Sequence, residues 1–287
     1  MKAHLDCIPC LLRQAIEASR LATEDEHLQR EAINSVMELI PHLPLHFSPP
    51  EIAREVHQEI RKVTGNPDPY KHLKTEHNRI ALNMYDHLKE LVAMSEDPLL
   101  TAIKVAIAGN VIDLGVAHSF GDLDDSIHST LSSSLAIKHY NVFRDKLTGT
   151  KSLLYLGDNA GEIVFDRILV EELRNRKDRE IVFVVRGGPA INDATMEDAE
   201  STGMKSLVKV ISNGWDAPAT VLSQCTSEMQ ELFYGADMII AKGQGNYESL
   251  SEMTNVFFLL KAKCAFVARN LRVNIGDSIL MHPESCS

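Results

Sequence analysis

The stretch that decides the fold is Ser152-Leu-Leu-Tyr-Leu-Gly-Asp-Asn-Ala-Gly-Glu-Ile-Val-Phe-Asp166. Its apolar run stops at a glycine, and Asp158 and Asn159 follow before a helical pattern starts near Gly161. This order predicts a strand, a tight turn and a helix. Ligands of open α/β sheets bind at the carboxyl ends of the strands. A carboxylate beside a carboxamide at that end suits a hard cation that prefers oxygen ligands.

A simpler interpretation of the same residues is an Asx turn in which Asp158 caps the helix. A second stretch favours the functional interpretation, because Val182-Phe-Val-Val-Arg-Gly-Gly-Pro-Ala-Ile-Asn-Asp193 also runs into glycines and then a polar pair. Adjacent parallel strands end at the same edge of a sheet, so Asp158, Asn159 and Asp193 are expected to converge. Arg186 either faces the same crevice or pairs with an acid at the surface.

The rhythm of the chain changes between its two halves. The first half has apolar residues at helical spacing, with a Ser48-Pro-Pro-Glu51 capping box, a helix over roughly 71–93 and a helix that starts at Asp97-Pro98 and stays apolar to Val116. The second half alternates β-rich runs with helical segments, which predicts βαβ units and a largely parallel sheet. The expected strands are 153–156, 181–185, 207–211, 238–241 and 264–268. We therefore expect an all-helical domain over 1–105 and an α/β domain over 106–287.

The overall composition narrows the class of partner. The chain has 287 residues, a net charge of −11 and five cysteines. The negative charge argues against nucleic acid or an anionic membrane as the main partner. An odd number of cysteines makes a secreted disulfide framework unexpected. With no apolar run long enough to cross a bilayer and no signal peptide, the protein is expected to be cytoplasmic.

A lysine and two glycines follow another expected strand, in Ile239-Ile-Ala-Lys-Gly-Gln-Gly-Asn-Tyr-Glu248. Gly243 and Gly245 allow close approach of the backbone to a ligand and can turn N–H groups toward an anion. Alone, Lys242 would be read as a surface lysine that extends its ammonium into solvent. Beside the expected metal site, Lys242 and this turn instead predict a phosphate site.

Two further groups of residues have open interpretations. Asn110 and Asp113 share one face of an apolar helix, and either satisfy each other through neighbouring backbone or line the site. Cys7-Ile-Pro-Cys10 is compatible with packing, with a second metal site or with redox chemistry. A zinc site would need two more ligands, for which His4, Cys264 and Cys286 are the candidates.

Taken together, the motifs at 109–113, 157–162, 186–193 and 242–248 resemble the signatures of the damage-control phosphatase family, known earlier as domain of unknown function eighty-nine. The Cys-x-x-Cys resembles its prokaryotic branch. The resemblance implies a Rossmann-like α/β/α core behind the helical part, and hydrolysis of small phosphorylated metabolites with a divalent cation (Mn²⁺, Mg²⁺, Co²⁺ or Ni²⁺). The alternative is a non-catalytic sensor module that binds a metal or nucleotide on the same fold.

By the same resemblance, Asp158, Asn159 and Asp193 are expected to bind the metal. Lys242, Gly243 and Gly245 are expected to hold phosphate, and Asn110 and Asp113 to complete the pocket. Independently of the resemblance, Arg186 is expected to bind substrate if it faces the crevice. For catalysis, Lys242 would stabilise charge, and either Asp158 or Asp113 would transfer the proton. The oligomeric state is left open.

Overall fold

The computed structural model describes residues 1–110 and 127–286. Its α/β part is built on a seven-stranded sheet with the strand order β1-β7-β6-β5-β2-β3-β4. All neighbouring strands are parallel except β6 and β7. The largely parallel sheet predicted from the sequence is therefore confirmed. The strands are β1 (Ile137–Lys138), β2 (Ser152–Leu156), β3 (Glu180–Val185), β4 (Lys209–Ser212), β5 (Met238–Lys242), β6 (Val256–Lys261) and β7 (Ser278–Met281).

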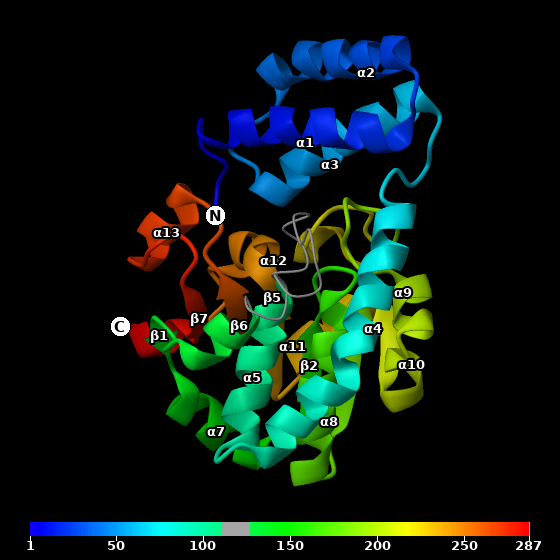
Figure 1. The fold of residues 1–287 in the computed structure, drawn as a ribbon. Helices are drawn as coiled ribbons and strands as arrows, with labels where there is room; N and C mark the ends of the chain where they lie inside the picture. The colour runs from blue at the N-terminus through cyan, green and yellow to red at the C-terminus, as the bar shows by residue number, and fades with distance from the viewer. Residues whose placement is uncertain (111–126, 287) are drawn as a thin grey trace.

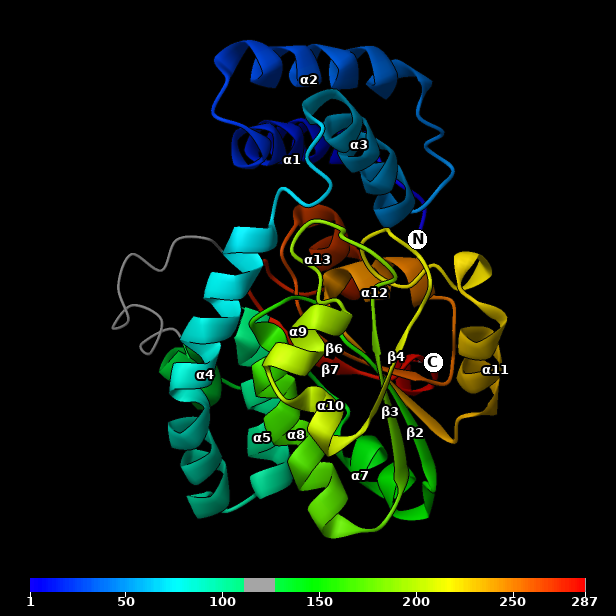
Figure 2. The ribbon, with the colours of Figure 1, turned by 90° about the vertical axis from the view of Figure 1, so that its right-hand side faces the viewer.

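Helices cover both faces of this sheet (Figures 1 and 2). Alternate residues of β2 enter different cores: Leu153 and Tyr155 pack on one face, and Leu154 and Leu156 on the other. Because both faces are buried, the strands read as continuous apolar runs. One face is covered by α4 (Lys71–Met94), α5 (Pro98–Ala108), α7 (Tyr140–Gly149), α8 (Glu162–Arg176), α9 (Met196–Ser201) and α10 (Met204–Leu207); the other by α11 (Ser227–Gly235), α12 (Gly243–Leu250) and α13 (Ala265–Leu271).

Three N-terminal helices form a separate body at one end of the sandwich (Figure 1). They are α1 (Cys7–Ala22), α2 (Glu26–Leu39) and α3 (Pro49–Thr64), and they share a small core of their own. The predicted capping box is present, since Ser48 and Glu51 bond reciprocally at the start of α3. Residues of α3 also contact α12, so the body lies over the edge of the sheet where α12 begins.

The packing partner of the chain changes near residue 70. Apolar residues of α1–α3 pack with Tyr70, whereas those of α4 and α5 belong to the core that covers the sheet. This change comes earlier than the predicted division at 105/106. Asp97 caps α5 by accepting a hydrogen bond from the Leu100 N–H at 3.1 Å, as predicted. The helix ends at Ala108, and its expected continuation to Val116 falls largely outside the described residues.

One predicted strand is wrong. Residues 264–268 form the start of α13, where Cys264 is the N-cap and its sulfur accepts from the Val267 N–H. The nearby strands are β6 and β7 instead. The periodicity of a short apolar run does not distinguish a buried strand from a buried helix. Here the N-cap hydrogen bond of Cys264 favours the helix.

A cluster of charges, which we call the α3 clamp, joins α3 to the loops that follow β3 and β4. It consists of Arg54, Arg61 and Asp216: the Asp216 carboxylate accepts from Arg54 Nε at 2.6 Å and from Arg61 at 2.9 Å. Arg61 also donates to the carbonyl of Pro189, and the Arg54 guanidinium stacks over Trp215. The helical body is thereby held against two loops that begin at the carboxyl edge of the sheet.

No helix among the described residues has both the length and the apolar character needed to cross a bilayer.

Candidate functional site

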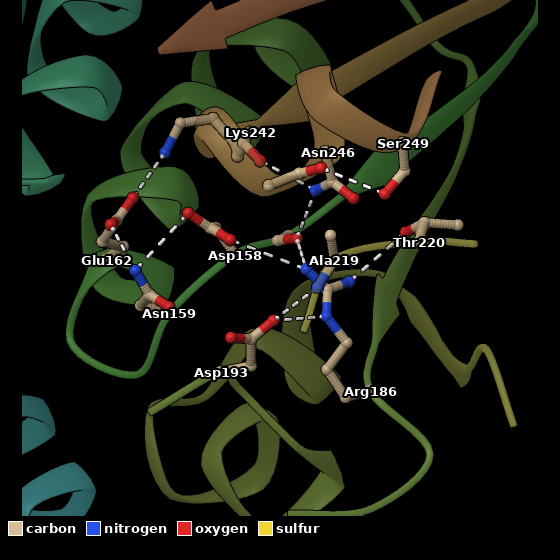
Figure 3. A network of polar contacts seen from close by, with 12 residues as sticks. Asp158, Asn159, Glu162, Arg186, Asp193, Ala219, Thr220, Lys242, Asn246 and Ser249 are labelled. Carbon is tan, nitrogen blue, oxygen red and sulfur yellow. Dashed lines mark hydrogen bonds and ion pairs between the residues drawn. The ribbon is translucent and has the colours of Figure 1, made fainter. Parts of the chain in front are cut away.

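Three adjacent strands deliver polar side chains to one edge of the sheet (Figure 3). β2 lies between β3 and β5, so the turns after these strands are neighbours. Asn159 and Asp193 form an isolated antiparallel bridge, and the Ala194 N–H donates to the Asp158 carbonyl at 2.8 Å. The structure thus brings Asp158, Asn159 and Asp193 together as expected; their role as metal ligands stays a prediction.

Asp158 is not a helix cap. The N-cap of α8 is Gly161, which has positive φ and no side-chain capping bond. Asp158 instead lies against Gly243, the first residue of α12, where an added Cβ would be 1.8 Å from Asp158 Oδ2. Gly243 also has φ +81°, a conformation that glycine adopts without steric cost. This glycine therefore allows the start of α12 to touch the carboxylate.

The expected glycine-rich turn is the first turn of α12. Gly245 lies within the helix, and an added Cβ there would meet Ala219 Cβ at 3.0 Å. Asn246 holds this turn to the site, because its Nδ2 donates to the Gly157 carbonyl at 3.0 Å. N–H groups at the start of a helix favour anions. The role of this turn in binding phosphate stays a prediction.

Arg186 is buried rather than at the surface, with 1% of its area exposed. Its Nε donates to Asp193 Oδ2 at 2.5 Å, and a terminal nitrogen lies 3.6 Å from Asp158 Oδ1. The same guanidinium donates to the Gly157 carbonyl and to the Thr220 hydroxyl. Arg186 therefore links the turns after β2 and β3 from within the protein. Its predicted contact with substrate stays a prediction.

Lys242 is also buried, which excludes the surface interpretation. Its Nζ lies 2.7 Å from Asp166 Oδ1 and 3.2 Å from Glu162 Oε2, and all three side chains are fully buried. We call Lys242, Glu162 and Asp166 the inner ion-pair cluster. Burial lowers the pKa of Lys242, but the charges of Asp166 and Glu162 outweigh it and raise the pKa above its usual value. Burial raises the pKa of Asp166 to about 6 despite Lys242.

Glu162 is the central residue that the sequence interpretation did not single out. Its Oε1 accepts from Asn110 Nδ2 at 2.7 Å and from Asn159 Nδ2 at 3.0 Å, while Oε2 faces Lys242. A glutamate in the first turn of a helix has an ordinary explanation in the helix dipole, so its position alone carried little signal. Asn110 does belong to the polar group, as expected. Asp113 lies outside the described residues.

The site is rich in negative charge around Asp158. Burial raises the pKa of Asp158 well above its usual range, and the carboxylates of Glu162 and Asp193 raise it further. Arg186 and Lys263 act in the opposite direction. Lys263 follows β6 and was also missed from the sequence; its backbone N–H donates to Gln244 in α12. A cluster of carboxylate and carboxamide oxygens favours a divalent cation.

The donor chemistry fits a hard metal ion. Asp158, Asn159 and Asp193 offer oxygen atoms from two turns, which suits magnesium or manganese better than a thiolate-preferring metal. In the described part of the chain, no group of three or more His, Cys, Asp and Glu side chains is placed to hold a metal, either at this site or elsewhere. The candidate triad differs from such groups because one of its members is a carboxamide.

The Cys7-x-x-Cys10 pair lies in the first turn of α1. Cys7 is half-buried, Cys10 is exposed, and both are free thiols, as is Cys264. Burial raises the pKa of Cys7, which disfavours the reactive thiolate. His4 stacks on Phe266 at 5.2 Å. The packing, metal and redox interpretations of this pair stay predictions.

Comparisons with known proteins agree with this fold. The damage-control phosphatase ARMT1-like domain matches residues 3–279. A protein of Methanocaldococcus jannaschii is 39% identical over 98% of this chain and 95% of its own length. Damage-control phosphatase PH1575 of Pyrococcus horikoshii is 36% identical over 98% of both chains. The crystal structure of this Pyrococcus protein, described as a DUF89 family protein, superposes with a TM-score of 0.92 and 35% identity over 99% of both chains.

The fold and site define an α/β protein whose polar site is built on the carboxyl edge of a parallel sheet. The chain belongs to the damage-control phosphatase ARMT1-like family, also called DUF89. The family expected from the motifs is confirmed, while the assignment of Cys-x-x-Cys to a particular branch stays a prediction.

Proposed function

We propose that this protein is a metal-dependent phosphomonoester hydrolase that acts on small phosphorylated metabolites. The observation that carries the proposal is the convergence of Asp158, Asn159 and Asp193 beside the first turn of α12. The name damage-control phosphatase, given to relatives that match almost the whole chain, supports the reaction class. A cytoplasmic location fits the proposal and stays a prediction.

The two sides of the site divide the work. Asp158, Asn159 and Asp193 would hold a divalent cation, which supplies positive charge and lowers the pKa of a bound water. On the other side, the N–H groups at Gly243–Gly245 and the nearby Lys263 would stabilise the oxygens of the transferring phosphoryl group. Proton transfer is assigned to Asp158 or Asp113, as in the sequence interpretation.

The test is turnover of a generic phosphate ester with Mn²⁺, Mg²⁺, Co²⁺ or Ni²⁺, with and without chelator. We expect Asp158→Asn and Asp193→Asn to lose on the order of 10²–10³ in rate, as when one preorganised charge stabiliser is lost. Asp145→Asn is the matched control, because Asp145 has 77% of its side chain exposed. Wild-type turnover by a folded double variant at 158 and 193 would refute the assignment.

The sensor alternative predicts a different result in the same experiment. A protein that binds Mn²⁺ tightly, yet turns over none of a panel of sugar phosphates and nucleotides with any of the four cations, would favour a binding module. The acidic surroundings of Asp158 already disfavour direct binding of a pyrophosphate without a cation.

A further inference from the structure

The surroundings of Lys242 do not suit a residue that binds substrate phosphate. The side chain is fully buried, and its Nζ contacts Asp166 at 2.7 Å and Glu162 at 3.2 Å. Two carboxylates already compensate the charge of Lys242, and an anion that reached it would have to enter the protein interior beside two like charges. The contacts therefore describe a fixed counter-charge.

Glu162 connects this counter-charge to two carboxamides. One oxygen, Oε1, accepts from both Asn110 and Asn159. The other oxygen faces Lys242, and Figure 3 shows Glu162 between Asn159 and Lys242. A carboxamide carries its donor and its acceptor on opposite sides, so holding Nδ2 fixes where Oδ1 points. With Nδ2 of Asn159 directed at Glu162, the carbonyl oxygen of Asn159 is the atom turned away from Glu162.

Asn110 gives an independent indication of a ligand. It is 2% exposed, and its Oδ1 has no hydrogen-bond partner among the residues that the structure describes. A buried carbonyl oxygen without a partner is costly in a folded protein, and bound water or an ion is a usual explanation. The nitrogen of the same carboxamide donates to Glu162 at 2.7 Å, so Glu162 fixes this oxygen as well.

We propose that Glu162, with Lys242 as its counter-charge, is a positioning residue that turns the carboxamide oxygens of Asn159 and Asn110 toward a divalent cation. On this proposal, Lys242 serves metal binding rather than phosphate binding, which replaces the role expected from the sequence. The inference rests on the proposed function in one respect only, namely that the site takes a divalent cation.

The experiment measures two dissociation constants without any turnover. Binding of Mn²⁺ is followed by titration of the protein, and binding of inorganic phosphate is followed on protein saturated with Mn²⁺. The variants are Glu162→Gln, Lys242→Met, Lys242→Arg and the double variant Glu162→Gln/Lys242→Met. Glu171→Gln and Lys89→Met are matched controls, because these residues form an ion pair at 2.6 Å outside the site, with Glu171 on the same helix.

We expect Glu162→Gln to weaken Mn²⁺ binding by roughly 10–100-fold, as for other residues that orient metal ligands. Lys242→Met should weaken it by a similar factor, and the double variant should bind no more weakly than the poorer single variant, because both changes remove the same support. Lys242→Arg should recover part of the affinity. Phosphate affinity of the Mn²⁺-saturated variants should change less than about threefold, because on this proposal neither Glu162 nor Lys242 contacts phosphate.

Several results would overturn the proposal. Unchanged Mn²⁺ affinity in Glu162→Gln would end it, and this variant decides the matter even if Lys242→Met does not fold. Weakened phosphate binding with normal Mn²⁺ affinity in Lys242→Arg would assign Lys242 to phosphate instead. A wild-type protein that binds no divalent cation would refute both this inference and the proposed function. A protein that binds Mn²⁺ but hydrolyses nothing would refute the proposed function alone.

Discussion

The inner ion-pair cluster and the α3 clamp differ in their access to water. The inner ion-pair cluster below the site is fully buried, with Lys242 between two carboxylates. The α3 clamp keeps 17–32% of each side chain exposed. Burial of the clamp raises the pKa of Asp216, but hydrogen bonds and charge from Arg54, Gln58 and Arg61 outweigh it and lower the pKa.

The difference in solvation predicts that the two groups of ion pairs differ in rigidity. A charge that loses its partner in the inner cluster has no water to replace it, so the cluster behaves as one fixed unit. Charges of the clamp can be hydrated again when the contact opens, so each contributes little. We therefore expect the floor of the site to be rigid and the helical body above it to be separable at modest cost.

The largest expected effect is from Lys242→Met, which leaves Glu162 and Asp166 buried without their cation. We expect the free energy of unfolding to fall by about 3–5 kcal/mol, measured by urea denaturation at neutral pH. Lys89→Met is the control, since Lys89 is 54% exposed. If Lys242→Met loses no more stability than the control, the two buried carboxylates do not depend on Lys242 for their compensation.

Gly243→Ala tests the rigidity of the same floor without changing a charge. The added Cβ would overlap Asp158 Oδ2, and φ is +81°. We expect a loss of about 2–3 kcal/mol from overpacking and backbone strain. Gly235→Ala is the matched control, because Gly235 has open space around its Cβ position. Equal stabilities of the two variants would mean that α12 moves away from Asp158 easily.

His57 lies on the buried side of α3 and makes the stability of the helical body depend on pH. Burial, aided by the charge of Arg61, lowers the pKa of His57 to about 4. Between pH 6.5 and 4 the unfolded chain therefore binds a proton that the folded chain does not, so stability falls as the pH falls. From pH 7 to pH 5 this contributes a loss of about 1–2 kcal/mol.

The contribution of His57 can be isolated by comparing urea denaturation of wild type and His57→Gln at both pH values. The difference in stability between pH 7 and pH 5 should shrink by that amount in the variant. His27→Gln, at an exposed position, should keep the wild-type difference. An unchanged pH dependence in His57→Gln would mean that His57 is protonated equally in both states.

The smallest effect is expected from Asp216→Asn, which removes the charge at the centre of the α3 clamp. Because the clamp is partly exposed, the loss should be about 1 kcal/mol or less, and it should shrink in high salt. Denaturation at low and high ionic strength measures both. A loss as large as that of Lys242→Met would contradict the proposed contrast between the two groups.

The sequence predicted that the residues of the candidate site would converge at one edge of the sheet, and it did so for a physical reason. Parallel strands end together, so the polar residues after β2 and β3 had to be neighbours if the sheet was parallel. The contacts of the Lys242 side chain could not be predicted from the ends of parallel strands alone. It depends on β5 lying beside β2, and on a facing helix that places Glu162 and Asp166 around the ammonium.

Other features were not predicted from the sequence, because their local patterns are compatible with several structures. Val256–Lys261 is an apolar run whose length fits a strand, but no turn motif marked it, and the run at 264–268 looked equally suitable. Glu162 resembled an ordinary acid at the start of a helix. Lys263 carried no signal, since its proximity to Asp158 follows from the position of β6 in the sheet.

The place of β2 within the sheet has a consequence for synthesis of the protein. A nascent chain that ends before β5 can pair β2 with β3 and β3 with β4, but the other edge of β2 stays open. An unprotected edge of this kind recruits strands from other molecules. Arrival of β5 closes that edge and, in the same movement, sets Gly243 against Asp158. Protection of this edge of β2 and the contact between Gly243 and Asp158 are thus gained in one step of folding.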